Sequence, residues 1–284
     1  MNDIAPTPVP DDPSGALTKQ ALTAAHAAAD HSGAVIRPLF RRPLDVINKA
    51  EGGRFDPVTQ ADRQAEDVLR ADLSAAFPDH AILGEERGLS GPDHAALTWV
   101  LDPIDGTRAF ITGLPTWGTL IALVGKHPVL GMMDQPYTGE RFWASDAGAY
   151  QRLSDGEERG LQTRTCCTLA EATLAATHPS IFAVEGELEA FSQVEREAAL
   201  SRYGADCYNY CMVAAGHIDV VIESGLQFYD VAALVPIVER AGGRLVDWHG
   251  KPITTAAQFR GQALAVGDEA LLGTILPLLA PAAR

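Results

Sequence analysis

The chain has few basic residues, few cysteines and no long apolar run, and each shortage excludes a class of protein. Its 284 residues include 22 lysines and arginines against 37 aspartates and glutamates, which gives a formal net charge of −15. A nucleic-acid backbone and an anionic membrane surface both bind positive charge, so neither is expected as a partner. The longest uncharged run, residues 109–125, is broken by glycine, proline and threonine. It is shorter than the roughly 18 apolar residues that indicate a membrane span.

Four cysteines are too few for a disulfide scaffold in a chain of this length. Residues 1–6 lack the basic start and the apolar stretch of a secretory signal. We therefore expect a cytoplasmic protein with reduced thiols. Hydrophobic residues make up 46% of the chain, which is enough for a packed core and excludes wholesale disorder.

The first half of the chain is predicted to be an α+β unit. Residues 1–14 hold four prolines and three aspartates without periodicity and predict a flexible tail. In residues 15–160, amphipathic patterns predict helices at about 17–36 and 59–77. Short β-type segments separated by Gly, Pro and Asp then favour a meandering antiparallel sheet. These segments lie at about 81–83, 98–101, 119–124 and 129–133.

A polar, charged stretch at residues 154–164 is the predicted boundary between two halves. In residues 161–284, β-type segments at about 173–177 and 218–222 alternate with helical patterns. Such alternation is typical of a helix-flanked α/β layer. The helices are expected at about 185–200, 207–216 and 230–241. The chain as a whole is therefore predicted to be α+β in its first half and α/β in its second.

The strongest chemical signal is the segment 99–107. A hydrophobic strand delivers Asp102 and Asp105 into a tight turn. Carboxylates with a backbone carbonyl between them are hard oxygen ligands of the kind that Mg²⁺ prefers. Gly106 and Thr107 would then present backbone N–H groups that suit a phosphate. The alternative is an ordinary Asp-Pro turn with a capping aspartate.

Three further segments place acids at strand ends or helix starts, where folds commonly form sites. They carry Glu85 with Glu86, Asp62, and Asp230. Each has an ordinary alternative: Asp62 and Asp230 could be N-terminal helix charges. Glu86 is interpreted as a solvated side chain. The combination of four acid-bearing segments favours a site over four unrelated acids.

These segments resemble the signature of the inositol monophosphatase superfamily, whose members are magnesium-dependent, lithium-sensitive phosphatases. The matching motifs are Gly84-Glu85-Glu86, Asp102-Pro103-Ile104-Asp105-Gly106-Thr107 and Asp230-Val231-Ala232. They keep the family's order and approximate spacing over nearly the whole chain. The resemblance implies an α+β and α/β fold, a layered αβαβα sandwich of the inositol monophosphatase and fructose bisphosphatase type. Tyr229 departs from the tryptophan that usually precedes the last metal-binding aspartate.

The resemblance also implies the metal ligands. Glu85, Asp102 and the carbonyl of Ile104 would hold a first Mg²⁺. Asp102, Asp105 and Asp230 would hold a second. The family binds two or three Mg²⁺ ions per site, and Mn²⁺ can replace them.

The remaining catalytic roles follow from the same resemblance. Thr107, with Asp62 behind it, would orient the attacking water, and Glu85 would complete the catalytic group. Two cations about 3.5–4 Å apart neutralise a phosphate monoester and lower the pKa of a bound water. An acidic protein would thus bind its anionic substrate through its metals.

Other segments resemble the histidinol-phosphate phosphatase branch more than inositol monophosphatase itself. They are Asn48-Lys49, residues 55–59, 131–136, 203–208 and 226–230. By the same resemblance, the predicted substrate contacts are Gly106, Thr107, Arg202, Gly204, Ala205, Asp206, Glu223 and Asp230. Histidinol phosphate carries an ammonium and an imidazole, which carboxylates such as Asp206 and Glu223 suit better than an uncharged ring of hydroxyls.

Some of these contacts have competing interpretations. Arg202 could approach the phosphate or pair with Glu223. Asp206 could instead cap the helix that follows it. Asn209, one turn into that helix, is a weaker candidate for a substrate contact. None of the eight histidines lies in these motifs, and they are interpreted as structural or solvated.

Three functions stay open. The first is histidinol-phosphate phosphatase, which acts in histidine biosynthesis. The second is the same machinery acting on inositol monophosphate, a sugar bisphosphate or a 3′-phosphoadenosine nucleotide. The third is a metal-binding regulatory or scaffold protein, although Thr107 and Asp62 argue against it because a structural cation site needs no water-orienting pair. The expected partners are a small phosphate monoester and, since the family is commonly dimeric, a second copy of the chain.

Overall fold

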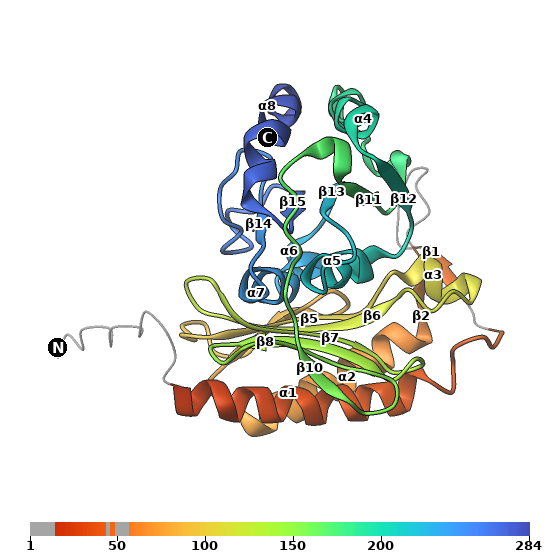
Figure 1. Cartoon of the computed structure of the whole chain (residues 1–284). Helices are drawn as coiled ribbons and strands as arrows, with labels where there is room; N and C mark the ends of the chain where they lie inside the picture. The colour runs from red at the N-terminus through yellow and green to blue at the C-terminus, as the bar shows by residue number, and fades with distance from the viewer. Residues whose placement is uncertain (1–14, 44–45, 49–56) are drawn as a thin grey trace.

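The computed structural model describes residues 15–43, 46–48 and 57–284, so the flexible tail predicted for residues 1–14 lies outside the described residues. Eight strands form the larger sheet, in the order β10-β9-β8-β7-β6-β5-β3-β4 (Figure 1). In chain order they are β3 (Ala81–Gly84), β4 (Gly88–Ser90), β5 (Thr98–Asp105), β6 (Gly118–Val124), β7 (Pro128–Gln135), β8 (Glu140–Ser145), β9 (Gly148–Arg152) and β10 (Glu158–Gly160). Only β3 and β5 run parallel; the other neighbours are antiparallel. A separate antiparallel pair consists of β1 (Val46–Asn48) and β2 (Pro57–Thr59).

Five strands from the second half form a mixed sheet in the order β12-β11-β13-β15-β14. They are β11 (Thr173–Ala176), β12 (Leu200–Tyr203), β13 (Val220–Ser224), β14 (Arg244–Val246) and β15 (Gln262–Val266). Strand β11 is parallel to β12 and β13, whereas β15 is antiparallel to β13 and β14. The central strands β13 and β15 are buried along their whole length, as expected for a sheet covered on both faces.

Eight α-helices accompany the sheets in the described part of the chain. They are α1 (Gly15–Ile36), α2 (Gln60–Ala76), α3 (Thr107–Thr112), α4 (Glu187–Glu197), α5 (Asp206–Ala214), α6 (Phe228–Val231), α7 (Leu234–Arg240) and α8 (Leu272–Leu279). Four 3₁₀ turns lie at 169–171, 179–181, 269–271 and 280–282. No helix among the described residues combines the length and the apolar character that crossing a membrane requires.

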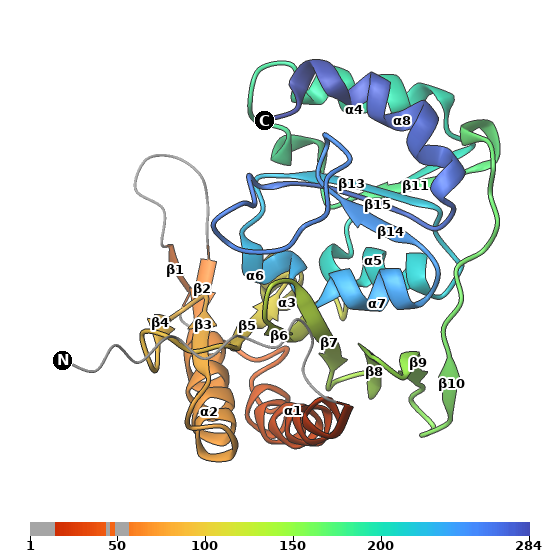
Figure 2. The same cartoon turned by 90° about the vertical axis from the view of Figure 1, so that its left-hand side faces the viewer.

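The elements stack in five layers, αβαβα. Helices α1 and α2 cover the outer face of the larger sheet, and α4 and α8 cover the outer face of the smaller one (Figures 1 and 2). Helices α5, α6 and α7 lie between the two sheets. Helix α1 buries alanines at a spacing of three and four residues, which puts small side chains on one face and lets the helix approach the sheet. The layered sandwich implied by the sequence resemblance is therefore confirmed.

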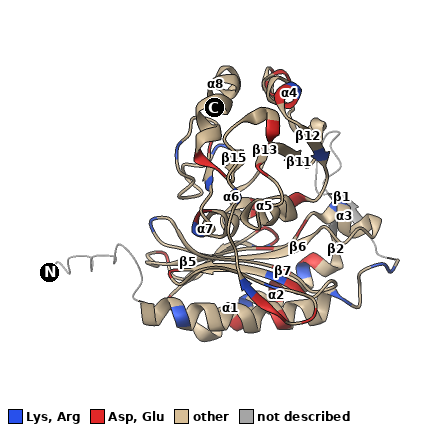
Figure 3. Ribbon diagram, in the orientation of Figure 1, with Lys and Arg blue, Asp and Glu red and all other residues tan. Residues whose placement is uncertain are grey.

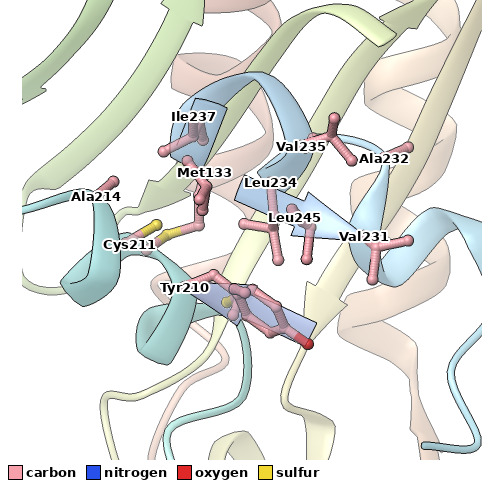
Figure 4. Packing of buried hydrophobic residues seen from close by; sticks show 14 of the residues in the cluster. Met133, Tyr210, Cys211, Ala214, Val231, Ala232, Leu234, Val235, Ile237 and Leu245 are labelled. Carbon is pink, nitrogen blue, oxygen red and sulfur yellow. The ribbon is translucent and has the colours of Figure 1, made fainter. Parts of the chain in front are cut away.

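The core between the sheets joins the two halves. Tyr210 and Cys211 of α5, Leu234 of α7, Leu245 of β14 and Met133 of β7 are buried together in it (Figure 4). The ring of Tyr210 packs in this core while its hydroxyl lies at the edge (Figure 4). The same apolar cluster thus anchors elements from both halves of the chain.

The local patterns gave most elements correctly and missed those that long-range pairing decides. Strands β8 to β10 extend the predicted meander to the edge of the larger sheet, and β12 replaces the end of the helix predicted at 185–200. The helix predicted at 230–241 is two helices, α6 and α7, separated by a turn. Pro236 explains the break, because it has no N–H to donate to the carbonyl of residue 232.

Gly131 of β7 allows the turn between α6 and α7 to touch the larger sheet. A Cβ at this position would lie 1.9 Å from the carbonyl oxygen of Ala233 and 2.7 Å from Cγ of Pro236. Only a residue without a side chain therefore fits between the sheet and this turn. The turn follows Asp230 by two residues, so the contact also fixes where that carboxylate lies.

Replacing Gly131 by alanine should lower the free energy of unfolding by about 1–3 kcal/mol, the usual cost of overpacking a filled core. Urea titration followed by circular dichroism measures the change. Gly273→Ala is the matched control, because no atom lies within 4 Å of a Cβ at that helical position. The control should stabilise the protein by about 0.5–1 kcal/mol through helix propensity. Equal effects of the two substitutions would contradict the close contact at Gly131.

Candidate active site

A cavity of about 680 Å³ opens where the two halves meet. Its walls come from the end of β5, the start of α3, the start of α5 and the segment that joins β13 to α6. Sequence-predicted residues that line it are Glu85, Asp102, Ile104, Asp105, Gly106, Thr107, Asp206, Glu223 and Asp230. Segments more than 100 residues apart in the chain therefore contribute to one cavity.

Asp102, Asp105 and Asp230 form the acidic centre of this cavity. One carboxylate oxygen from each lies within 4.8 Å of the others. Residues three apart on a regular strand point to opposite faces of a sheet. The pairing of β5 with β6 is irregular between Asp102 and Asp105, and this irregularity lets both carboxylates reach the same side.

Backbone N–H groups hold one oxygen of each aspartate in the centre. Asp102 accepts a hydrogen bond from the N–H of Ile104 at 3.1 Å. Asp105 accepts one from the N–H of Cys207 at 2.7 Å, which links the first half to the start of α5. Asp230 accepts one from the N–H of Gln227 at 2.7 Å. The second oxygen of each carboxylate is left for other partners.

Burial and mutual repulsion dominate the electrostatics of the cluster. Burial, followed by the charges of Glu85, Asp105 and Asp230, raises the pKa of Asp102 well above its usual range. Burial likewise raises the pKa of Asp105, with Asp206 and Asp230 adding to the effect. Burial raises the pKa of Asp230 to about 8. Figure 3 shows acidic residues in both halves, including the start of α5.

The donor set fits a divalent cation of the hard class. Glu85, Asp102, Asp105, Asp230 and the backbone carbonyl of Ile104 offer only oxygen, the ligand type of Mg²⁺ and Mn²⁺. Positive charge at the centre would also relieve the repulsion that raises these pKa values. The residues present therefore suit the metal that the sequence resemblance implied.

Thr107 and Asp62 meet beside the acidic centre. The Thr107 hydroxyl donates to the carbonyl of Ile104 at 3.0 Å and lies 3.5 Å from Oδ1 of Asp62. The other oxygen of Asp62 accepts hydrogen bonds from the N–H and the hydroxyl of Thr59, at 2.9 and 2.5 Å. Asp62 therefore completes a capping box at the start of α2 and also faces Thr107. Its helix-start interpretation is therefore confirmed, and its water-orienting role stays a prediction that the contact with Thr107 supports.

Asp206 and Glu223 line the same cavity and have different surroundings. Glu223 accepts hydrogen bonds from the N–H and hydroxyl of Thr177, at 2.9 and 2.5 Å, and from the hydroxyl of Tyr210 at 3.0 Å. Burial raises the pKa of Glu223 to about 7. Asp206 has a longer contact of 3.5 Å to the hydroxyl of Thr177, and burial raises its pKa to about 6. The charge of Arg108, which also lines the cavity, acts on Asp206 in the opposite direction.

The sequence did not point to Thr177 or Tyr210, although both line the cavity. Thr177 directly follows strand β11, a position typical of site residues. Tyr210 lies four residues after Asp206 on α5 and therefore on the same helix face. These positions are the only sequence signals that could have identified the pair.

The structure does not bring every predicted contact to the cavity. Arg202 is exposed on β12, does not line the cavity, and is not among the groups hydrogen-bonded to Glu223. Gly204 and Ala205 lie next to the cavity without lining it. Asn209 donates its side-chain N–H to the carbonyl of Gly204 at 2.7 Å, which is a structural role.

Two further interpretations need correction. Asp206 is not a helix cap, since Ala205 occupies the N-cap position of α5 and no side chain bonds there. Ala205 and Asp206 have φ values of 82° and 40°, a left-handed conformation that costs energy for residues with side chains. Glu86 was expected to be solvated, but its side chain is only 3% exposed and lies 3.8 Å from Nε of Arg63.

Comparison with known proteins gives consistent relatives. Residues 18–280 match the inositol monophosphatase family. Over 228 residues the chain is 46% identical to the bifunctional phosphatase IMPL2, chloroplastic, of Arabidopsis thaliana, covering 80% of this chain and 64% of that protein. It therefore spans less than two thirds of that relative. Over 238 residues it is 36% identical to a histidinol-phosphatase of Streptomyces coelicolor, covering 81% and 88%.

Among solved structures, an inositol monophosphatase from Zymomonas mobilis is similar throughout. The TM-score is 0.80 at 43% sequence identity, and the match covers 92% of this chain and 98% of that one. The fold and the positions of its elements are thus shared with a phosphatase of known structure.

The raised pKa values predict how metal and pH act on stability. Glu223 and Asp230 have folded-state pKa values of about 7 and about 8, above their ordinary values of 4.5 and 3.8. Between these limits the folded state binds more protons than the unfolded state, so stability falls as pH rises. The melting temperature of chelator-treated protein should therefore be lower at about pH 8.5 than at about pH 6.5.

Mg²⁺ should raise the melting temperature more at the higher pH, because it replaces protons that the carboxylates hold at the lower one. Differential scanning calorimetry at both pH values, with Mg²⁺ and with chelator, measures this. A melting temperature of the metal-free protein that rises with pH, or an Mg²⁺ effect equal at both values, would contradict the assignment of the acidic centre.

Proposed function

This chain belongs to the inositol monophosphatase family, and from this premise we propose that it is a Mg²⁺-dependent phosphatase whose substrate is histidinol phosphate. The observation that carries the proposal is a cavity lined by two groups of carboxylates. Asp102, Asp105 and Asp230 form a compact cluster. Asp206 and Glu223 form a second pair, near enough for their charges to act on Asp105 and Asp230, and an organic cation would pair with them.

The acidic centre supports hydrolysis of a phosphate monoester. Mg²⁺ bound there would neutralise charge on the phosphate and lower the pKa of a coordinated water. Thr107 would orient that water together with Asp62. The single proton of the Thr107 hydroxyl can go to the carbonyl of Ile104 at 3.0 Å or to Asp62 at 3.5 Å, and in either case its lone pairs are left to accept a hydrogen bond from the water.

The Asp206 and Glu223 pair supports a cationic leaving group. Asp206 is largely buried, has a long contact of 3.5 Å with the hydroxyl of Thr177 and is also influenced by the charge of Arg108. An ammonium or imidazolium group would satisfy this carboxylate better than a neutral hydroxyl would. Glu223 is held rigidly by Thr177 and Tyr210, which would keep the second carboxylate in place. The histidinol-phosphatase among the relatives of this chain agrees with this preference.

Hydrolysis of inositol monophosphate is the second candidate. It is favoured by the inositol monophosphatase from Zymomonas mobilis, which is similar over 92% of this chain. Glu223 has both oxygens engaged as acceptors already, and such a carboxylate can also receive a sugar hydroxyl. The two candidates share the acidic centre and differ only in what Asp206 and Glu223 would bind.

Phosphate release from a small panel of esters tests the proposal. With Mg²⁺, histidinol phosphate should show a higher kcat/KM than inositol 1-phosphate or glycerol phosphate, and chelator should abolish all three activities. Asp102→Asn serves as the inactive control. Faster hydrolysis of inositol 1-phosphate would overturn the substrate but not the reaction. No release from any ester with Mg²⁺ or Mn²⁺ would overturn the phosphatase itself.

Asp206→Asn should reduce kcat/KM for histidinol phosphate by about 10- to 150-fold, since a partly desolvated charged hydrogen bond contributes about 1.5–3 kcal/mol. Glycerol phosphate carries no cation in its organic part, so its loss should be several-fold smaller. Initial rates on both esters at saturating Mg²⁺ give the comparison, and saturation removes any effect on metal affinity. Equal losses on the two esters would assign Asp206 to the scaffold.

A further inference from the structure

Glu66 is a fully buried carboxylate that the proposed reaction does not use. It lies on α2, one turn after Asp62, and its side chain is 0% exposed. Its two oxygens accept hydrogen bonds from the N–H groups of Glu86 at 2.7 Å and Arg87 at 3.0 Å. These two residues directly follow Glu85, a predicted metal ligand. The carboxylate of Glu66 therefore binds the backbone of the turn that carries Glu85.

Arg70 extends this grip along the same turn. Its Nε donates to Glu66 at 2.7 Å, and its guanidinium also donates to the carbonyl of Gly88 at 2.5 Å and to the hydroxyl of Ser90 at 2.7 Å. Glu66 and Arg70 together, named here the α2 clamp, therefore hold the turn between β3 and β4 from its start to its end. Gly84 makes the approach possible, since a Cβ there would lie 2.3 Å from Oε1 of Glu66.

The α2 clamp fixes the backbone on the far side of Glu85. On the near side, the N–H of Glu85 donates to the carbonyl of Leu101 on β5 at 3.2 Å. Glu85 is thus held between β5, which carries Asp102, and α2. Repulsion from the charge of Asp102 would otherwise push this turn outward.

We propose that the α2 clamp is a positioning device that holds Glu85 in the metal-binding cavity. Burying a charged pair such as Glu66 and Arg70 costs desolvation energy, and an ordinary hairpin turn forms without a buried charged pair. Stabilising the turn is therefore a weak explanation for this pair. This proposal rests on the proposed function in one respect, because it assumes that Glu85 binds the metal. Asp62, four residues before Glu66 on the same helix face, meets Thr107. One rigid helix thereby places a metal ligand and the water-orienting pair together.

Glu66→Gln tests the device, with Asp67→Asn as a matched control. Asp67 is the next residue on α2 and binds the Arg87 side chain of the same turn at 2.9 and 3.0 Å, but both groups are about half exposed. The two variants lose the same charge near the same turn. Only Glu66→Gln changes the group that accepts hydrogen bonds from the N–H groups of residues 86 and 87.

Isothermal titration calorimetry of chelator-treated protein with Mn²⁺ and Mg²⁺ supplies the first measurement. We expect Glu66→Gln to bind each ion about 10- to 100-fold more weakly, the usual effect of removing a group that orients a ligand. Asp67→Asn should stay within about twofold of the wild type, because exposed ion pairs contribute little. Unchanged ion affinity in folded Glu66→Gln would overturn the proposal.

Hydrogen exchange of residues 84–88 in the metal-free protein supplies a second measurement that does not depend on metal binding. It should quicken at least tenfold in Glu66→Gln and not in Asp67→Asn. If Glu66→Gln fails to fold, Glu66→Asp retains the charge, shortens the reach and should give the same two changes. A wild type that binds neither ion would remove the proposed function, while the exchange data would still decide whether the α2 clamp holds the turn. Unchanged exchange would overturn it.

Discussion

The structure depends on bringing like charges together out of water. Asp102, Asp105 and Asp230 come from both halves of the chain, and one oxygen of each lies within 4.8 Å of the others. Backbone N–H groups partly offset this repulsion. Each of these aspartates, and Asp62 beside them, has one oxygen that accepts a hydrogen bond from a main-chain N–H. One side of each carboxylate is thereby fixed, and the layered fold supplies the donors at the ends of its strands and helices.

Much of this site was predictable because its residues sit at ends of local elements. Asp102 and Asp105 follow an apolar strand, and Asp62 and Asp230 begin helices, which periodicity locates well. Capping and site roles turned out to be compatible, since both helix-start aspartates complete capping boxes and also face their neighbours in the site. The pattern that predicts a helix start therefore also located Asp62 and Asp230.

The remainder of the site depends on which distant segments pair, and local patterns contain little of that information. Thr177 matters because β11 runs beside β13, which carries Glu223. Glu66 stands in an ordinary amphipathic helix, and only the approach of the β3–β4 turn gives it partners. Arg202 shows the converse: the family resemblance made it a predicted substrate contact, but its strand is the edge of the smaller sheet and leaves it exposed.

The link from Cys207 to Asp105 has a bearing on how this protein can vary. The donor is a main-chain N–H, so the bond does not depend on which side chain occupies position 207. Nineteen of the twenty common amino acids carry that N–H, and only proline lacks it. This main-chain contact between the two halves can therefore persist when the side chain at position 207 changes. Replacing Cys207 by a small residue would remove the thiol and its own contact with Asp105 but leave the main-chain hydrogen bond.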